Sequence, residues 1–329
     1  MRNLIVAFSI FAVIAFAVIL VLSHAKNDPP DDDREYIRSI LPNIPPFKDL
    51  ASEGNTRVTV YGLRPNADDS PLYQWERELY ATMLQGIDKG LAQKSPSLHN
   101  MAHIPAGRYV LGETETEITE HRFLRRQAVE LESFYIDKTV VTADQYNRCV
   151  AEKMCLPMLA MDRPGQYGSD FPALLVYKQA ERYCHWAGKR LPTEYEWEAA
   201  ARGGDQRIYP WGDEPPTDKL ANICGAECGF AWSDPDWHDG YLRTSPVDAF
   251  PDADNPFGLR QLVGNVKEWV DTHRKLPKNF FIARSASWYS DLHETPLTYS
   301  QLWFPGTRTD DKGVRCAISA SAVKSTPSK

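Results

Sequence analysis

The sequence lacks the basic excess that a nucleic-acid-binding protein needs. Its 329 residues include 37 Lys and Arg against 44 Asp and Glu, which gives a net charge of −7. We see no local basic stripe and no internal repeat, so nucleic acid is not an expected partner. The length allows one large domain with appendages, and 43% apolar residues, including nine Trp, can fill its core.

The N-terminus lacks charge over one long stretch. Leu4 to Leu22 is a nearly unbroken apolar run with Arg2 before it and Lys26 after it. Such a run has about the length that spans a bilayer, and Arg2 favours a cytoplasmic N-terminus. We therefore expect residues 1–25 to be a single-pass transmembrane anchor with the C-terminal domain outside the cytoplasm, periplasmic or extracellular. The alternative is a cleaved secretory signal ending at Ala25.

Cysteine is scarce and confined to the stretch from Cys149 to Cys316. None lies near the N-terminus, so a lipoprotein anchor is not supported. The six cysteines are even in number, and an exported chain meets an oxidising compartment, so we expect disulfides. Cys149 with Cys155 and Cys224 with Cys228 are close enough to close small loops. A zinc site is disfavoured because neither pair has the two-residue gap common in structural zinc sites.

The segment before the domain lacks a core-forming pattern at its start. Residues 26–100 begin as a tether rich in Pro and acidic residues. A short strand at Val58–Gly62 and an amphipathic helix at Leu72–Leu91 are expected further on, the helix packing on the domain or on a partner. The domain itself should span residues 101–320, with a flexible tail at 321–329.

Local patterns predict several elements inside the domain. Thr193 and Glu196 form a capping box for a helix over residues 194–202. The remaining expected elements are a helix from Tyr177 to Ala187, an opening strand and turn over His103–Gly112, a strand at Val129–Ile136 and a helix that starts at Thr142. From Tyr209 to Trp269 the chain is largely irregular, so it needs rigidity from disulfides or bound calcium.

Five ordered sequence blocks resemble the formylglycine-generating enzyme, or sulfatase-modifying factor, domain family. The blocks are Gly188-Lys-Arg-Leu-Pro-Thr-Glu-Tyr-Glu-Trp-Glu198, Arg202-Gly-Gly204, Tyr209-Pro-Trp-Gly212, Gly264-Asn-Val-Lys-Glu-Trp269 and Gly313-Val-Arg-Cys316. The resemblance covers about two-thirds of the chain. It implies an α+β fold, the formylglycine-generating enzyme variant of the C-type-lectin-like fold, with much irregular chain. It also implies a disulfide between Cys184 and Cys316.

The resemblance further implies two calcium sites. Calcium binds six to eight hard oxygens, which loops supply from side chains and carbonyls. The first site maps to the side chains of Asn222 and Asp239 and the carbonyls of Ile223 and Tyr241. The second maps to Gln261, Gly264, Val266 and Glu268, with Gln261 in place of the family's Asn. The alternative is that Asn222 and Asp239 are ordinary turn residues and Glu268 a surface charge.

The family's copper site is where this sequence departs from the pattern. Two cysteines five residues apart bind copper(I) in the enzyme and run its oxygen-dependent oxidation of a substrate cysteine. Ser290 and Thr295 occupy those positions here. A hydroxyl cannot replace a thiolate as a copper(I) ligand, so copper is not expected and the oxidase reaction looks lost. The degenerate pocket retains Ser287, Trp288, Ser290, His293 and Thr295.

Two functional hypotheses follow. The first is a membrane-anchored, calcium-stabilised binding or accessory module whose old substrate groove recognises a protein, peptide or cell-envelope ligand. The second is an enzyme, either a formylglycine-type oxidase or a relative that uses another metal. Asp291, His293 and Glu294 offer a hard-metal set, and Ser290 with His293 a conceivable nucleophile and base. Whether the chain is an enzyme stays open at this stage.

Overall fold

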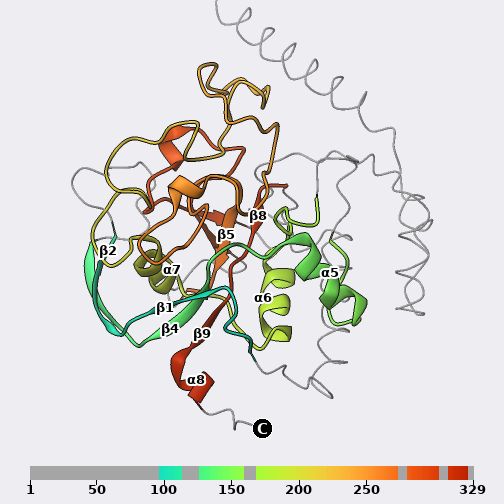
Figure 1. Ribbon diagram of the computed structural model, residues 1–329, viewed down its shortest axis with the longest axis vertical. Coiled ribbons are helices and arrows are strands. Elements are labelled where there is room, and N and C mark those ends of the chain that lie inside the picture. Colours follow the sequence, from blue (N-terminus) through green and yellow to red (C-terminus); the bar gives the residue numbers. More distant parts are fainter. Residues whose placement is uncertain (1–95, 113–125, 159–167, 273–279, 304–309, 325–329) are drawn as a thin grey trace, which may run out of the picture. The chain divides into compact units, whose positions relative to one another are not determined.

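A computed structural model describes residues 96–112, 126–158, 168–272, 280–303 and 310–324 (Figure 1). The expected anchor, tether, and strand and helix between residues 58 and 91 lie outside these ranges, as do residues 325–329. Among the residues that are described, no helix has both the length and the apolar character that a membrane crossing requires.

The described strands form three small sheets. The first sheet is antiparallel, in the order β1 (Met101–Ile104), β4 (Phe134–Asp137) and β9 (Ala317–Ser319). The second pairs β2 (Gly107–Leu111) with β3 (Gln127–Leu131). The third has the order β7 (Ser300–Trp303), β6 (Phe281–Arg284), β5 (Lys267–Val270) and β8 (Lys312–Gly313), with β5 and β8 parallel. The first sheet thus joins the two ends of the domain.

The helices confirm the local predictions. α7 (Glu194–Ala201) begins after Thr193, whose hydroxyl accepts the Glu196 N–H while the Glu196 carboxylate accepts the Thr193 N–H. α6 (Tyr177–Trp186) has the predicted start. α5 (Ala143–Ala151) follows Thr142 with a second capping box. These caps satisfy backbone donors at the helix starts, which is why sequence alone could place them.

Three predicted boundaries were wrong. The single strand expected at Val129–Ile136 is two strands, because β3 pairs with β2 whereas β4 pairs with β1. The opening strand is also divided, since Pro105 has no N–H to donate to a ladder and lies between β1 and β2. Residues 321–324 of the expected tail belong to a short helix, α8 (Ala320–Lys324), beside β9.

Three disulfides tie the domain together, as predicted. Cys184 on α6 is bonded to Cys316, just before β9. Cys149–Cys155 and Cys224–Cys228 close short loops. All six cysteines of the chain are therefore oxidised, and no thiol is free.

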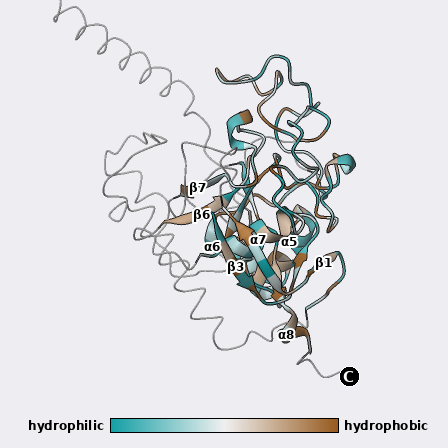
Figure 2. Ribbon diagram, turned by 90° about the vertical axis from the view of Figure 1, so that its left-hand side faces the viewer, coloured by the Kyte–Doolittle hydropathy of each residue, from teal (hydrophilic) through white to brown (hydrophobic). Residues whose placement is uncertain are grey.

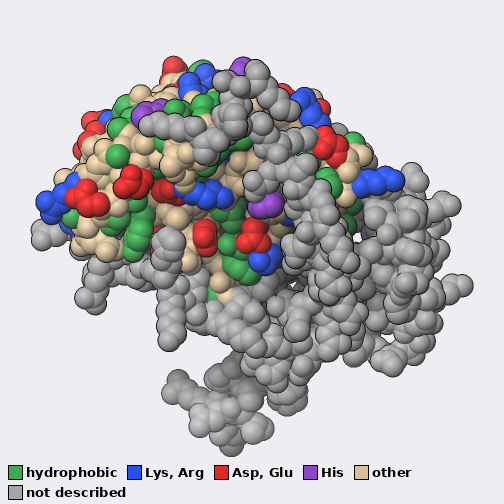
Figure 3. Space-filling view, turned by 90° about the horizontal axis from the view of Figure 1, so that it is seen from below, with side chains coloured by type: hydrophobic (Ala, Val, Ile, Leu, Met, Phe, Trp, Pro, Cys, Tyr) green, Lys and Arg blue, Asp and Glu red, His purple; other side chains and the backbone are tan. Residues whose placement is uncertain are grey.

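The segment between α7 and β5 is irregular, as predicted. The short 3-10 helix η2 (Pro251–Ala253) is its one regular element. In Figure 1 its yellow to orange loops lie above α7 and β5, and the irregular chain in the upper part of Figure 2 mixes hydrophilic and hydrophobic residues. On the face seen in Figure 3, acidic and basic side chains are interspersed over the described surface, without a broad basic field.

Candidate functional site

Both positions of the family's copper ligands are buried and hydrogen-bonded. The Ser290 hydroxyl accepts bonds from Lys267 Nζ at 3.0 Å and from the Ser287 N–H at 2.9 Å, and it donates to Glu294 Oε2. The Thr295 hydroxyl donates to the Leu292 carbonyl at 2.7 Å. Each hydroxyl is thus engaged inside the protein.

A buried ion pair lies under Ser290. Lys267, on β5, has a side chain only 3% exposed and pairs with Glu294, at the end of the 3-10 helix η3 (Leu292–Glu294). The Tyr299 hydroxyl donates to Glu294 Oε1 at 2.6 Å, and Lys267 Nζ lies 4.8 Å from the Tyr299 ring. Burial raises the pKa of Glu294, but the Lys267 ammonium and the hydrogen bonds lower it below its usual value. We call Lys267, Ser287, Ser290, Glu294 and Tyr299 the Lys267 network.

A second buried pair adjoins this network. Lys312 Nζ donates to Asp311 Oδ1 at 2.7 Å and lies 3.3 Å from the centre of the Trp303 ring. Ser287 connects the two pairs, because its hydroxyl donates to Asp311 Oδ2 at 3.2 Å. Burial lowers the pKa of Lys312 to about 8. Fixed polar partners therefore surround the position that corresponds to the first copper ligand of the family.

The hard-metal set considered from the sequence does not converge. The His293 side chain is 95% exposed, and Asp291 accepts the His293 backbone N–H at 2.9 Å as a cap for η3. Glu294 instead turns inward to Lys267. Ser290 is buried and its hydroxyl donates to Glu294, not to the exposed His293, so the two do not form a nucleophile and base pair. Within the described ranges, no group of three or more His, Cys, Asp or Glu side chains is arranged to hold a metal.

The first predicted calcium loop has features that fit a cation. Asn222 donates from Nδ2 to the Arg243 carbonyl at 2.8 Å, while its Oδ1 is buried without a partner. Asp239 accepts the N–H groups of Ile223 and Tyr241 at 3.1 and 2.9 Å. Burial raises the pKa of Asp239 to about 6, and the nearby Glu227 charge adds to this. A buried amide oxygen without a partner, near a buried carboxylate, is an arrangement that a bound cation would stabilise.

The Asn222 loop is packed directly against Gly264. The Asn265 N–H donates to the Asn222 carbonyl at 2.8 Å, and Gly264 has a φ of +82°. A Cβ atom at Gly264 would collide with that carbonyl. Glycine is therefore required here both for the backbone angle and for the close approach.

The second predicted calcium set is arranged differently. Gln261 donates from Nε2 to the Pro246 and Ala249 carbonyls at 2.6 and 2.9 Å, and its Oε1 accepts from Asn265. Both carboxylate oxygens of Glu268 accept from Arg315, at 2.7 and 2.8 Å. A guanidinium thus supplies the positive charge beside Glu268. The side-chain oxygens of Gln261 and Glu268 are thus already bonded to protein donors, so they do not offer themselves to a cation as they are folded.

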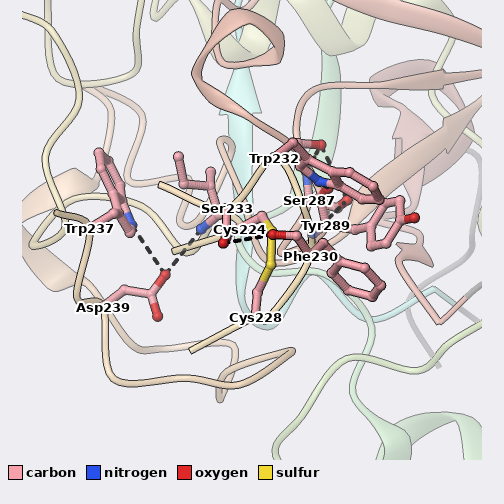
Figure 4. The surroundings of a disulfide bond; sticks show 11 residues. Cys224, Cys228, Phe230, Trp232, Ser233, Trp237, Asp239, Ser287 and Tyr289 are labelled. Carbon is pink, nitrogen blue, oxygen red and sulfur yellow. Dashed lines mark hydrogen bonds between the residues drawn. A yellow bond between two sulfur atoms is a disulfide. The ribbon is translucent and has the colours of Figure 1, made fainter. Parts of the chain in front are cut away.

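Sequence reasoning missed the contacts that Lys267 and the Cys224–Cys228 loop make with the pocket. Lys267 and Glu268 lie between apolar residues in the sequence, Val266 on one side and Trp269 and Val270 on the other. A lysine within such a stretch was the available signal, and the structure buries it. The Cys224 N–H donates to the Ser290 carbonyl at 2.9 Å, which places the disulfide beside the pocket (Figure 4). Of the five residues assigned to the degenerate pocket, Ser287, Trp288, Ser290 and Thr295 are buried together and His293 is not.

Comparisons with known proteins agree with this fold. Residues 88–320 match the model of the sulfatase-modifying factor enzyme 1-like domain. The mouse inactive C-alpha-formylglycine-generating enzyme 2 is 30% identical over 274 residues, which is 68% of this chain and 87% of that protein. Bovine formylglycine-generating enzyme is 32% identical over 217 residues, 52% of this chain and 57% of that protein.

Among solved structures, PvdO from Pseudomonas aeruginosa has a TM-score of 0.55 and 26% identity, covering 66% of this chain and 93% of that one. The chain spans little more than half the length of some curated relatives that it matches. The family model nevertheless covers well over half of the chain, in the region that carries the disulfides and the Lys267 network. The chain therefore belongs to the sulfatase-modifying factor, or formylglycine-generating enzyme-like, domain family.

Proposed function

We propose that this chain is a binding or accessory module of the family that has lost the copper oxidase chemistry. The observation that carries the proposal is the Lys267 network at the copper position. Ser290 there contacts an ammonium and a carboxylate, and neither is a ligand for copper(I), which prefers soft thiolates. The Glu294 carboxylate is paired with Lys267, so it is not free to bind a metal cation.

The relatives do not decide this question by name. One similar protein is called inactive and another is called a formylglycine-generating enzyme. The residues of this chain must therefore decide whether the oxidase chemistry remains. Ser290 and Thr295 are the residues that differ from the family's copper-binding cysteines.

One observation favours the enzyme alternative. The Cys224–Cys228 disulfide lies beside Ser290, so reduction would release two thiols near the pocket. Both cysteines are buried, however, and the space next to the Ser290 hydroxyl is taken by Lys267 and Glu294. We therefore assign the disulfide a structural role.

We further propose that calcium stabilises the irregular segment through the first loop. The Asn222 Oδ1 atom, the Asp239 carboxylate and the Ile223 and Tyr241 carbonyls would hold it. The ion would supply charge neutralisation and rigidity, with no part in a reaction. The orphaned Asn222 oxygen supports this role.

We also propose that the domain is displayed outside the cytoplasm by the N-terminal apolar run. Three disulfides in one domain fit an oxidising compartment. The partner in this proposal is a protein, peptide or cell-envelope ligand held at the former substrate groove.

Copper(I) titration tests the loss of oxidase chemistry. The purified domain would compete with a colorimetric copper(I) chelator, once with its disulfides intact and once after mild reduction. We expect no transfer of copper to the oxidised protein. Transfer of one copper ion per chain to the oxidised protein, at an affinity that withstands the chelator, would show that the pocket still binds the metal.

A further inference from the structure

A polar pocket lies where several segments of the domain meet. Its volume is about 490 Å³, and its walls come from the chain before β1, the chain after β4, the start of α5, and the loops at Asp170 and at residues 247–260. Small-molecule pockets occupy about 300–1,000 Å³, so this one can hold a ligand. None of its described lining residues belongs to the Lys267 network or to the two predicted calcium sets. We call this separate site the Lys138 pocket.

The lining of the Lys138 pocket is strongly charged. Five of its described residues are ionisable, namely Lys138, Arg260, Asp170, Asp248 and Asp254. Val247 is the one apolar side chain among the described lining residues, and none of them is aromatic. An apolar ligand would strip water from the charged groups without offering them partners, which is costly. The lining therefore favours a small ligand that is itself charged.

Main-chain hydrogen bonds place the charged residues of the pocket. The Arg260 N–H donates to the Lys138 carbonyl at 2.8 Å, so the segments that carry the two cations are adjacent. The Val247 N–H donates to the Asp170 carbonyl at 3.0 Å, which brings the segments of Asp170 and Asp248 together in the same way. The pocket thus receives its free charges from two fixed pairs of segments, and little ordering is needed when a ligand binds.

One cation and two carboxylates of the pocket have no partner in the protein. Arg260 Nε donates to Asp254 Oδ2 at 3.2 Å, so these two charges offset each other. Within the described ranges, the side chains of Lys138, Asp170 and Asp248 form no ion pair and no hydrogen bond. Asp254 Oδ1 is also buried without a partner. The pocket therefore offers one place for a negative group and two for positive groups.

Two simpler classes of ligand fit the pocket less well. A metal ion is disfavoured, because the described residues include no group of three or more His, Cys, Asp or Glu side chains arranged to hold one, and Lys138 and Arg260 would repel it. An inorganic anion is disfavoured at the start of α5, because the N–H groups of Ala143, Asp144 and Gln145 already donate to oxygens of the protein. Three carboxylates in the lining would repel it as well.

We propose that the Lys138 pocket binds a free amino acid with a cationic side chain, such as lysine. The α-carboxylate of the ligand pairs with Lys138, and its two ammonium groups pair with Asp170 and Asp248. The two cations and three anions of the lining give a net charge of −1, which one net positive charge on the ligand neutralises. This site is additional to the binding function proposed for the former substrate groove and does not depend on it.

Isothermal titration calorimetry of the full chain in mild detergent, with L-lysine as the probe, tests the inference. The matched ligands are cadaverine, which lacks the carboxylate, and ε-aminocaproate, which lacks the α-ammonium group. L-Glutamate reverses the charge of the side chain. The protein variants are Lys138→Met and Asp248→Asn, with Lys178→Met as the control because Lys178 is an exposed lysine on α6. Circular dichroism melts check that each variant is folded.

We expect L-lysine to bind, and cadaverine and ε-aminocaproate to bind about fivefold more weakly or worse. Lys138→Met should raise the dissociation constant of L-lysine by about tenfold. The same variant should not weaken cadaverine, because that ligand has no carboxylate to lose its partner. Asp248→Asn should weaken both L-lysine and cadaverine, and Lys178→Met should change neither. L-Glutamate should not bind.

Several results would overturn the inference. They are no binding of L-lysine at millimolar concentration, equal affinity for L-lysine and cadaverine, and an equal loss of both ligands in folded Lys138→Met, which would indicate a structural role for this lysine. Binding of inorganic phosphate with no binding of L-lysine would also overturn it. None of these results bears on the copper titration, which tests the loss of oxidase chemistry separately.

Discussion

Replacing Lys267 with methionine should destabilise the domain strongly. Lys267 is 3% exposed and its partner Glu294 is 24% exposed, so the substitution leaves a largely buried carboxylate without its cation. Removing one partner of a fully buried pair costs about 3–5 kcal/mol. Water reaches part of Glu294, so we expect the free energy of unfolding to fall by about 2–3 kcal/mol, and the melting temperature by about 5–10 °C.

Urea unfolding at neutral pH with the disulfides intact, followed by tryptophan fluorescence, measures this change. Lys178→Met is the matched control, because Lys178 pairs with Glu181 at the surface with 42% and 48% exposure. Loss of that pair should cost no more than about 0.5 kcal/mol. Adding Glu294→Gln to Lys267→Met should recover part of the loss. If Lys267→Met were no more costly than the control, the pocket would not be held by this ion pair.

Three further predictions concern other parts of the domain. Burial lowers the pKa of Lys312 in the folded domain to about 8, below its ordinary 10.5, so the unfolded chain binds more protons between these two pH values. The free energy of unfolding should therefore rise as the pH increases across this range. Lys312→Met should remove that rise in melts recorded at different pH values. Calcium should raise the melting temperature of the native domain after dialysis against a chelator, and an equal calcium response in Asp239→Asn would count against the first loop as the site. Gly264→Ala should lower the free energy of unfolding by about 2 kcal/mol or more, because its φ is positive and a Cβ would meet the Asn222 carbonyl. Gly229 has a φ of +73° and open space around it, so Gly229→Ala measures the effect of the backbone angle alone. Similar losses for the two variants in urea unfolding would argue against the close contact at Gly264.

Local signals predicted the helices and the two short disulfide loops. The Thr193–Glu196 capping box is a contact within one turn, so its residues are adjacent in sequence. The pairing of Cys184 with Cys316, 132 residues apart, was implied instead by the resemblance to the family. The division of Val129–Ile136 had a signal that the prediction overlooked. The apolar residues fall at Val129 and Leu131 and then at Phe134 and Ile136, so the alternation shifts by one residue at Glu132 and Ser133, where the strand changes partner.

The content of the pocket needed the structure. The sequence showed that Ser290 and Thr295 lack sulfur, but it did not show what fills the space. Lys267 reaches Ser290 and Glu294 only because β5 and β6 pair and place the loop after β6 above Lys267. His293 and Glu294 are adjacent in sequence, yet one faces solvent and the other faces Lys267, because η3 turns them to opposite sides.

The most direct test of the central claim is aldehyde formation in a substrate peptide. The intact domain would be incubated with a Cys-x-Pro-x-Arg peptide, copper and oxygen, and the product analysed by mass spectrometry after trapping with a hydroxylamine probe. An active formylglycine-generating enzyme serves as the positive control. We predict that the peptide cysteine stays unconverted. Catalytic turnover to formylglycine would contradict the account, because it would show that a pocket without free thiols still performs the oxidation.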